Sequence, residues 1–409
     1  MSAVRVLAGA VPTTPVGRWW TARFTLAWLG AWTASLVPIQ LALPDQLSAI
    51  DYAHRVRDFG LLNGLVGLVS IAALPLFGSL SDRTRSRFGP RRTWVLGGVA
   101  VYAIGLVLTG RQTELGWLAA CWVLAMIGNT MMATGLTAVI ADDVPEQQRG
   151  AMSAAVYGPQ ALGVVIGLVA VTSLGAANRY LALAVALVLL TLPFLIGHRD
   201  RVEPRSDPIR PRSLLLALYI PVRENPDYTW AFWGRMSVNI GNALGTTYLL
   251  FFLRDYLKVP DPDASLLQVV LVYLVATLIA TFAGGLLSDR LGRRKIFVAV
   301  ASTLQAIAGV MLAVNPTFDT ALYASALLGA GYGAFMSVDQ ALITQVLPDP
   351  QDRAKDLGTM NIGSVVPQMF GPVLAALLIS VSGYRALFAA AGVITVLGTL
   401  MVYRIKSVP

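Results

Sequence analysis

The feature that most constrains this chain is a series of long, almost uncharged apolar stretches. A helix needs about 20 mostly apolar residues to cross the hydrocarbon core of a membrane. The runs are continuous and do not alternate in polarity, which is typical of helices and not of β-barrel strands. We therefore predict an all-α membrane protein with twelve transmembrane helices, at 22–43, 60–80, 93–110, 115–141, 151–175, 178–198, 228–253, 264–288, 295–315, 320–346, 355–380 and 384–404.

The composition excludes other classes of protein. Charged residues make up 13% of the chain, whereas soluble domains carry about 25%, and a hydrophobic content of 56% excludes disorder. The single cysteine, Cys121, excludes a disulfide framework, and two histidines, His54 and His198, argue against a metal site. No Walker-type loop is found. We expect no metal, no cofactor and no nucleic acid partner.

The basic residues predict the orientation in the membrane. If both termini are cytoplasmic, 23 of the 31 Lys and Arg residues lie on the cytoplasmic side, seven lie on the other side, and Arg235 lies within an apolar stretch. This asymmetry follows the positive-inside rule, so we predict a multi-pass protein of the plasma membrane with both termini in the cytoplasm. The longest polar break divides the chain into a bundle at 1–198, a cytoplasmic linker at 199–227 and a bundle at 228–409.

The two halves repeat the same motifs at a nearly constant offset. GSLSDRTRSRFGPRR ends the second apolar stretch and GGLLSDRLGRRK ends the eighth, so that Asp82 and Asp289 are 207 residues apart. Pro159-Gln160 in the fifth stretch matches Pro367-Gln368 in the eleventh. The repeat predicts two pseudo-symmetric six-helix bundles, an architecture typical of secondary transporters with a substrate site between the halves.

The repeated loop resembles motif A of the major facilitator superfamily, G-x-L-x-D-R-x-G-R-R, and the resemblance covers nearly the whole chain. The longer SDRTRSRFGPRR form resembles the sucrose/proton symporter-like branch, which is related to the glycoside–pentoside–hexuronide symporters, although Pro90 departs from the pattern of that branch. The resemblance implies a transporter that works by alternating access in the lipid bilayer, not an enzyme. We expect it to be a monomer.

In the family, the motif latches the two halves together on the cytoplasmic side. We expect Gly78 and Gly284 to allow close helix approach, and Asp82 to bridge to an arginine or to the positive N-terminus of a neighbouring helix. The alternative is that the arginines only set topology and bind anionic lipid headgroups. The candidate latch residues are Gly78, Asp82, Arg83, Arg91, Arg92, Asp289, Arg290 and Arg293.

Two charged residues lie well inside apolar stretches. Arg235 is in the seventh and Asp339 in the tenth, each on the order of 10 Å from the cytoplasmic end of its helix at 1.5 Å per residue. Charges inside a membrane tend to face a cavity and to have a partner. We predict an Arg235–Asp339 ion pair, or a relay through water, that couples transport to protons. The alternative is a purely structural pair that holds two helices together.

Polar and aromatic residues at helical spacing predict a substrate cavity at the same level. Amides flanked by aromatic rings suit polyhydroxyl solutes such as sugars. The alternative is ordinary hydrogen bonding and packing between helices. The candidate cavity residues are Trp28, Trp32, Asn129, Tyr157, Gln160, Asn239, Asn242, Tyr332, Met336, Asn361 and Gln368.

The predicted function is secondary active transport of a small polar organic solute, for example a sugar or glycoside, together with a proton. The sodium-coupled melibiose-type relatives carry acidic residues in the second helix, and this sequence has none there, which favours a proton over sodium. The main alternative is proton-driven efflux of a drug or metabolite, because uptake and efflux share this scaffold.

Overall fold

The computed structural model describes residues 14–145, 148–200, 225–291, 294–346 and 353–406, and all regular secondary structure in these ranges is helical. The linker predicted at 199–227 lies almost entirely outside the described residues. The chain divides into two compact units. The first consists of the described residues of Met1–Ala53 and Leu65–Arg210, and the second of those of His54–Gly64 and Pro211–Pro409.

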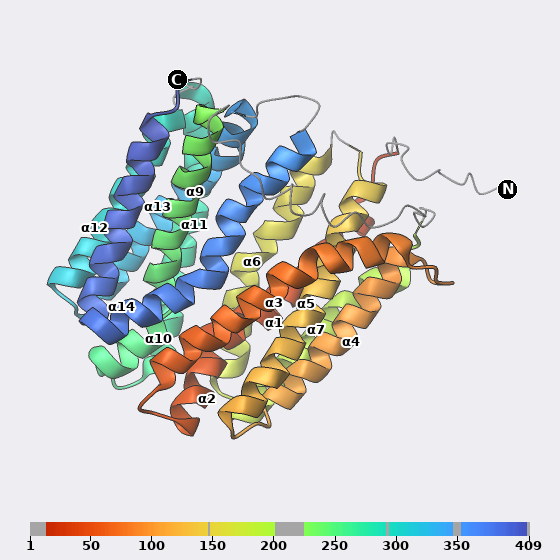
Figure 1. Ribbon diagram of the computed structural model, residues 1–409, viewed down its shortest axis with the longest axis horizontal. Helices are drawn as coiled ribbons and strands as arrows, with labels where there is room; N and C mark the ends of the chain where they lie inside the picture. The colour runs from red at the N-terminus through yellow and green to blue at the C-terminus, as the bar shows by residue number, and fades with distance from the viewer. Residues whose placement is uncertain (1–13, 146–147, 201–224, 292–293, 347–352, 407–409) are drawn as a thin grey trace. The chain divides into compact units, whose positions relative to one another are not determined.

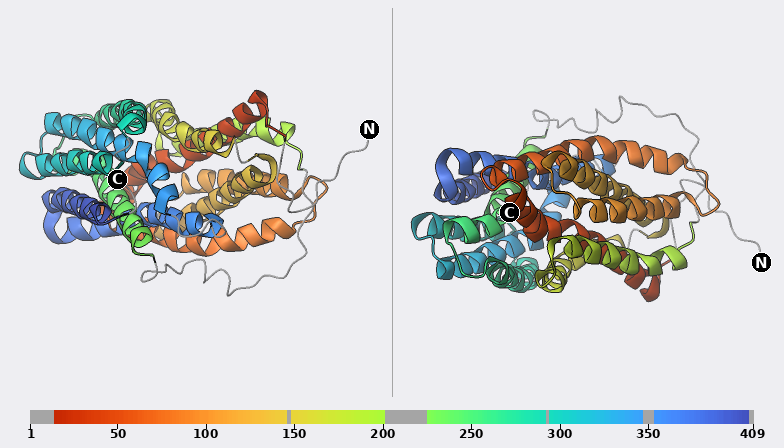
Figure 2. Two further views of the ribbon diagram at one scale, coloured as in Figure 1. Left: turned by 90° about the horizontal axis from the view of Figure 1, so that it is seen from above. Right: turned by 90° about the horizontal axis from the view of Figure 1, so that it is seen from below.

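Each unit is a bundle of long helices (Figures 1 and 2). The first contains α1 (Arg18–Val37), a π-helical turn η1 (Pro38–Ala42), α2 (Leu43–Ile50), most of α3 (Arg55–Arg83), α4 (Pro90–Thr109), α5 (Leu115–Asp143), α6 (Arg149–Thr172) and α7 (Ala176–Gly197). The second contains the start of α3, then α9 (Pro226–Thr246), α10 (Leu249–Phe251), a π-helical turn η3 (Phe252–Tyr256), α11 (Pro262–Leu291), α12 (Arg294–Val314), α13 (Phe318–Val346) and α14 (Arg353–Tyr403).

Ten helical segments among the described residues are long and apolar enough to cross a membrane. Every predicted stretch overlaps a helix, but two differences explain why ten segments are found where twelve were predicted. α6 has 24 residues, and Gly158–Thr172 is the apolar segment in the part of it whose side chains the structure describes. The last two stretches lie in one segment, Val366–Tyr403, because α14 continues through Gly383. The chain is an all-helical, multi-pass membrane protein, and twelve helices with cytoplasmic termini stay a prediction.

Gly383 is where α14 changes direction. Its φ of 76° and ψ of −178° are not helical, and a positive φ is one that glycine adopts without a steric penalty. The two limbs of α14, coloured in two shades of blue, therefore meet as a V in Figure 1. Residues 353–382 form the first limb and residues 384–403 form the second.

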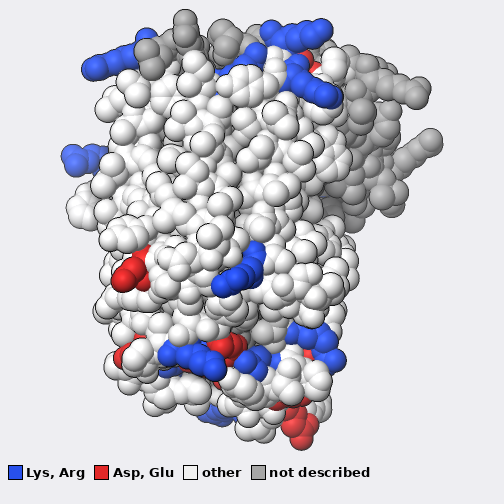
Figure 3. All heavy atoms as spheres, turned by 90° about the vertical axis from the view of Figure 1, so that its left-hand side faces the viewer, with Lys and Arg blue, Asp and Glu red and all other residues white. Residues whose placement is uncertain are grey.

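Within the first unit, α1 packs on α6 and α7, and α4 packs on α5 and α7. Within the second unit, α9 packs on α14 and α13, α11 on α13, and α12 on α13 and α14. On the face shown in Figure 3, charged side chains gather toward the two ends of the helices, with few between them. This distribution is the one that a hydrocarbon environment imposes, because a charge at a helix centre costs about 2.5–3.5 kcal/mol on insertion scales.

Candidate functional site

The predicted charge pair forms inside the second unit. Arg235 on α9 lies with its Nη1 atom 3.3 Å from Oδ2 of Asp339 on α13, and both side chains are buried, 7% and 3% exposed. Neither Arg235 Nη1 nor Asp339 Oδ2 forms a hydrogen bond with any residue that the structure describes. Their contact is therefore an ion pair. Arg235 Nε also donates to Ser364 Oγ on α14, at 2.7 Å. The guanidinium therefore connects three helices.

Polar side chains extend this site along α9. Asn239 Nδ2 donates to the backbone oxygen of Arg235 at 2.8 Å, and its Oδ1 accepts from the Tyr332 hydroxyl at 3.3 Å. One turn further on, Asn242 Oδ1 accepts from the hydroxyl of Tyr273 on α11 at 3.1 Å. Tyr273 could not be predicted from the sequence, since a tyrosine in an apolar helix gives no sign that its hydroxyl meets an amide. The structure thus joins Arg235, Asn239, Tyr332, Asp339, Ser364, Asn242 and Tyr273 in one polar region.

The other predicted cavity residues have different surroundings. Met336 packs against the hydrophobic core of the second unit, and Gln368 on α14 is exposed. In the first unit, Trp28 and Trp32 stack with ring centroids 5.9 Å apart, and Trp32 Nε1 donates to the backbone oxygen of Val156 at 2.8 Å. Asn129 and Gln160 are half-buried, and the side chains of Tyr157 and Asn361 are not among those described.

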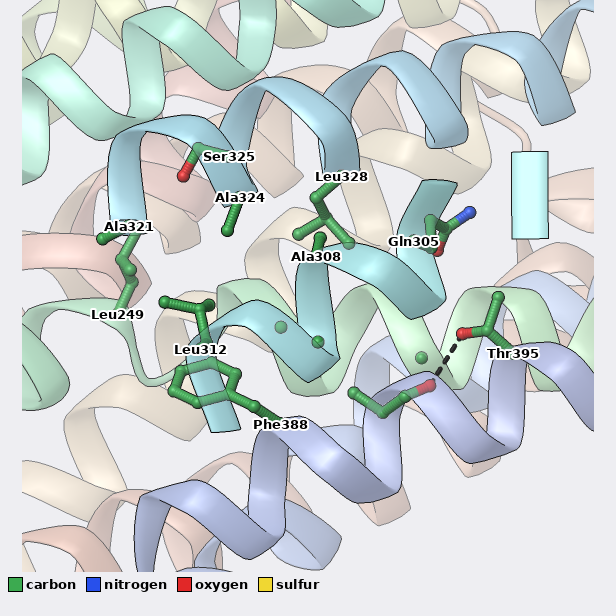
Figure 4. Close-up of a pocket in the computed structure, with 14 residues that line it drawn as sticks. Leu249, Gln305, Ala308, Leu312, Ala321, Ala324, Ser325, Leu328, Phe388 and Thr395 are labelled. Carbon is green, nitrogen blue, oxygen red and sulfur yellow. Dashed lines mark hydrogen bonds between the residues drawn. The ribbon is translucent and has the colours of Figure 1, made fainter. Parts of the chain in front are cut away.

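A small cavity lies elsewhere in the second unit, among α9, α12, α13 and α14 (Figure 4). Its walls are mostly small or apolar side chains, with Gln305, Ser325 and Thr395 as the polar exceptions. Neither Arg235 nor Asp339 lines it. The cavity is therefore separate from the polar region.

The motif residues of the first unit form a compact ion network centred on Arg91. The Arg91 guanidinium lies 2.7 Å from Asp82 Oδ1, donates from Nε to Asp142 Oδ2 at 2.7 Å, and donates from Nη1 to Ser81 Oγ at 2.9 Å. Asp82 thus bridges to an arginine. Asp142 was not among the candidate residues, because a carboxylate at a helix end is common and carries no distinctive spacing.

The remaining latch candidates give a mixed result. The backbone N–H of Arg92 donates to Asp200 Oδ2 at 3.0 Å, Arg83 is half-buried and Arg290 is exposed. Arg293 lies outside the described residues, as does the side chain of Asp289. A Cβ at Gly284 would lie 2.7 Å from Ser337 Oγ, which agrees with close helix approach. At Gly78 a Cβ would lie 4.0 Å from Thr134 Cγ2, which is an ordinary van der Waals contact.

Comparison with known proteins points to membrane transporters. A family profile described as "Major Facilitator Superfamily" matches residues 24–260 and 231–409. The multidrug resistance protein MdtG of Dickeya zeae is 23% identical over 397 residues, which cover 92% of this chain and 92% of that protein. The major facilitator superfamily multidrug transporter mfsC of Aspergillus fumigatus is 29% identical over 133 residues, 32% of this chain and only 26% of that protein.

A solved structure has the same fold. The crystal structure of a POT family transporter in complex with a thioalcohol-conjugated peptide superposes on 94% of this chain and 94% of its own, with a TM-score of 0.71. The sequence identity is 13%. At that level the likeness concerns the fold alone.

Proposed function

The chain belongs to the Major Facilitator Superfamily and is a membrane transporter, and from this premise we propose that it moves a small polar organic solute by alternating access, coupled to protons. The observation that carries the proposal is the buried Arg235–Asp339 pair. Ionisable residues within membrane helices are costly, and they mark substrate, ion and proton pathways.

The pair has the chemistry that proton coupling needs. With Arg235 beside it, the Asp339 carboxylate keeps its charge, because the guanidinium offsets the cost of burying a lone anion. When a conformational change moves the arginine away, the unpaired carboxylate favours taking up a proton. Because Arg235 also binds Ser364 on α14, a movement of α14 relative to α9 changes this contact. Protonation is thereby linked to a movement of helices.

The polar groups next to the pair support the proposed substrate class. Asn239 with Tyr332, and Asn242 with Tyr273, exchange hydrogen bonds within the unit. Amides and phenols can transfer such bonds to the hydroxyl groups of a solute, and aromatic faces pack against sugar rings. A sugar or glycoside could form hydrogen bonds with these groups. This substrate class also agrees with the resemblance of the motif loop to the sucrose/proton symporter-like branch.

A second candidate is proton-driven efflux of a drug or metabolite. The observation that favours it is the full-length similarity to a protein named for multidrug resistance. The same ion pair would couple efflux to protons entering the cell. The two candidates differ in the solute that binds and in the direction in which it moves.

A thermal-shift screen of the purified protein separates the two solute classes. A ligand that binds only the folded state raises the melting temperature according to its concentration relative to its Kd. Sucrose and a set of glycosides form one panel, and ethidium and tetraphenylphosphonium form the other. Stabilisation by the first panel alone supports sugar transport. Stabilisation by the second panel alone favours efflux and would overturn the proposal of sugar transport.

Proteoliposomes test the coupling with the solute that the screen finds. Wild-type protein should accumulate it against its gradient when a pH gradient is imposed. Asp339→Asn should lose accumulation but retain counterflow exchange, because exchange needs binding and movement without net proton transfer. Asp319→Asn is the matched control, since Asp319 is an exposed aspartate in the first turn of the same helix. Unchanged pH-driven accumulation in Asp339→Asn would rule out the coupling role.

The orientation is proposed from the distribution of Lys and Arg, with both termini cytoplasmic and the functional halves at 1–198 and 228–409. In this orientation the Arg91 network faces the cytoplasm and serves as the proposed latch. In a Cys121→Ala background, a membrane-impermeant maleimide added to intact cells should label Thr113→Cys and spare Ser86→Cys. The reverse pattern would contradict the orientation.

A further inference from the structure

The first unit contains a buried histidine that the proposed function does not use. His198 directly follows α7, and its side chain is 3% exposed. Its imidazole stacks on Phe194, with ring centroids 4.8 Å apart and an interplanar angle of 12°. Its ring centroid lies 6.4 Å from that of Trp20 on α1, in an edge-to-face arrangement. The two aromatic rings and the burial fix the position of the imidazole.

Both nitrogens of this imidazole face carboxylates. His198 Nε2 lies 2.8 Å from Asp200 Oδ1, and Nδ1 lies 3.6 Å from Asp143 Oδ2 at the end of α5. The side chains of Asp200 and Asp143 are 4% and 8% exposed. A carboxylate accepts hydrogen bonds, and a neutral imidazole has one N–H and one lone pair. Only the protonated imidazolium presents an N–H group to both carboxylates at once.

Asp200 connects this cluster to the motif turn between α3 and α4. Its Oδ2 atom accepts a hydrogen bond from the backbone N–H of Arg92, in the first turn of α4, at 3.0 Å. No side chain caps α4 at its own N-cap position, which is Gly89 with φ 91°. A Cβ at Gly89 would overlap the Asp200 side chain. Asp200 therefore supplies the negative charge that a helix N-terminus favours, although it lies beyond α7 in the sequence.

Four arginines among the described residues lie near the cluster in space or in sequence. From α4, Arg91 binds Asp82 and Asp142. From α1, the guanidinium of Arg23 lies against Gly197, next to His198. Arg199 is exposed, and the side chain of Arg92 lies over the ring of Phe88. Among the described residues, the carboxylates directed at the imidazole are thus Asp143 and Asp200.

We propose that His198, Asp143 and Asp200 form a proton-binding site separate from Asp339, whose occupancy controls how firmly the motif turn at 84–92 is held. Histidine is the side chain whose charge ordinarily changes between about pH 5 and pH 8. With a proton on both nitrogens, the imidazolium donates to Asp200, pairs with the charge of Asp143 and holds Asp200 on the first turn of α4. With one proton lost, one carboxylate faces a lone pair, and the Asp200 cap loosens.

Hydrogen–deuterium exchange of the purified full-length protein tests this at pH 6 and pH 8, with rates corrected for the intrinsic pH dependence of amide exchange. The probe is a peptide that covers residues 84–95. In wild type, protection of the first-turn amides of α4 should fall by about tenfold at pH 8, an effect of the size that a hydrogen bond to a charged group supports. His54→Gln, which alters the other, exposed histidine, should keep this profile.

Two variants make opposite predictions. His198→Gln should abolish the pH dependence of this peptide. Asp143→Asn leaves only the Asp200 carboxylate for the imidazole, so the single N–H of a neutral imidazole is enough to hold Asp200 on α4. Protection of the first-turn amides of α4 at pH 8 should therefore rise to the level that wild type has at pH 6. Misfolding cannot mimic such a gain of protection.

The proposal is overturned if wild type shows no pH difference, if His198→Gln retains the wild-type difference, or if Asp143→Asn shows no gain at pH 8. Asp339→Asn should keep the wild-type exchange profile. Failure of this proposal and failure of the coupling role of Asp339 are therefore distinguishable.

Discussion

Arg235 donates a hydrogen bond of 2.7 Å from its guanidinium Nε to the hydroxyl oxygen of Ser364. The Nη1 atom of the same guanidinium lies 3.3 Å from Asp339. The two contacts lie on α14 and α13, while the arginine itself belongs to α9. The position of the guanidinium thus depends on both partner helices. Removing either contact should have a measurable effect.

Ser364→Ala should lower the melting temperature of the detergent-solubilised protein, because it removes the acceptor for Arg235 Nε in a buried site. Hydrogen bonds between membrane helices contribute about 0.6 kcal/mol on average and at most about 1.7 kcal/mol, so the shift should be small but resolvable. Ser364→Thr keeps the hydroxyl and should stay close to wild type. Equal losses in both variants would show that packing, and not the hydrogen bond, is responsible.

Arg91→Met should destabilise the first unit. It leaves Asp82 and Asp142 facing each other across the space of the lost cation. Their side chains are 32% and 20% exposed, so water screens part of the repulsion and the loss should stay below the cost of breaking a fully buried ion pair, which is about 3–5 kcal/mol. The measurement is the fraction of monodisperse protein that survives heating, determined by size-exclusion chromatography. Arg85→Met, at an exposed arginine of the same turn, is the control. Adding Asp82→Asn and Asp142→Asn to Arg91→Met should restore part of the stability, and no recovery would argue against the ion network.

The helices and the central ion pair could be predicted from the sequence for the same physical reason. A membrane excludes charge, so apolar runs mark the helices and the rare charges within them mark functional positions. Arg235 and Asp339 stood out because their helices hold almost no other charge, and the structure brings them together. The same reasoning could not identify Tyr273 or Ser364 as partners, because tyrosine and serine are ordinary in such helices.

At the helix ends, the exclusion of charge from the membrane cannot be used to identify functional residues. Asp142, Asp143, His198 and Asp200 lie where charged residues are expected in any membrane protein, and they come from two segments more than fifty residues apart. Their association depends on how α5 and α7 pack on α4, which periodicity does not encode. The break at Gly383 is different, because this non-helical glycine lies between the stretches predicted at 355–380 and 384–404.

Gly383→Ala should destabilise the protein through the backbone alone. Its φ of 76° is unfavourable for a residue with a Cβ, while no other atom lies within 4 Å of the position that the Cβ would occupy. With ψ at −178° the backbone lies in a region that is essentially restricted to glycine, so the expected loss is about 1–3 kcal/mol. Gly383→Asn should lose a similar amount, since the tolerance of asparagine for positive φ is mostly confined to the left-handed helical region, where ψ is about +30 to +60°. Thermal unfolding of the two variants measures the loss, and equal stability of Gly383→Ala and wild type would contradict the assigned backbone conformation.

Two adjacent glycines on α4 offer a matched pair with opposite expected outcomes. A Cβ at Gly98 would overlap the backbone of Met132 on α5, and backbone cannot move aside as a side-chain end can. At Gly97 the nearest atom is the flexible Met131 Cε, 3.7 Å away. Gly98→Ala should therefore force α4 and α5 apart and lower the melting temperature by several degrees. Gly97→Ala should be neutral or raise stability by about 0.5–1 kcal/mol, because alanine favours the helix.

Thermal unfolding of both variants in one detergent measures the difference. If both alanines are tolerated equally, α4 and α5 do not pack as closely as the structure places them.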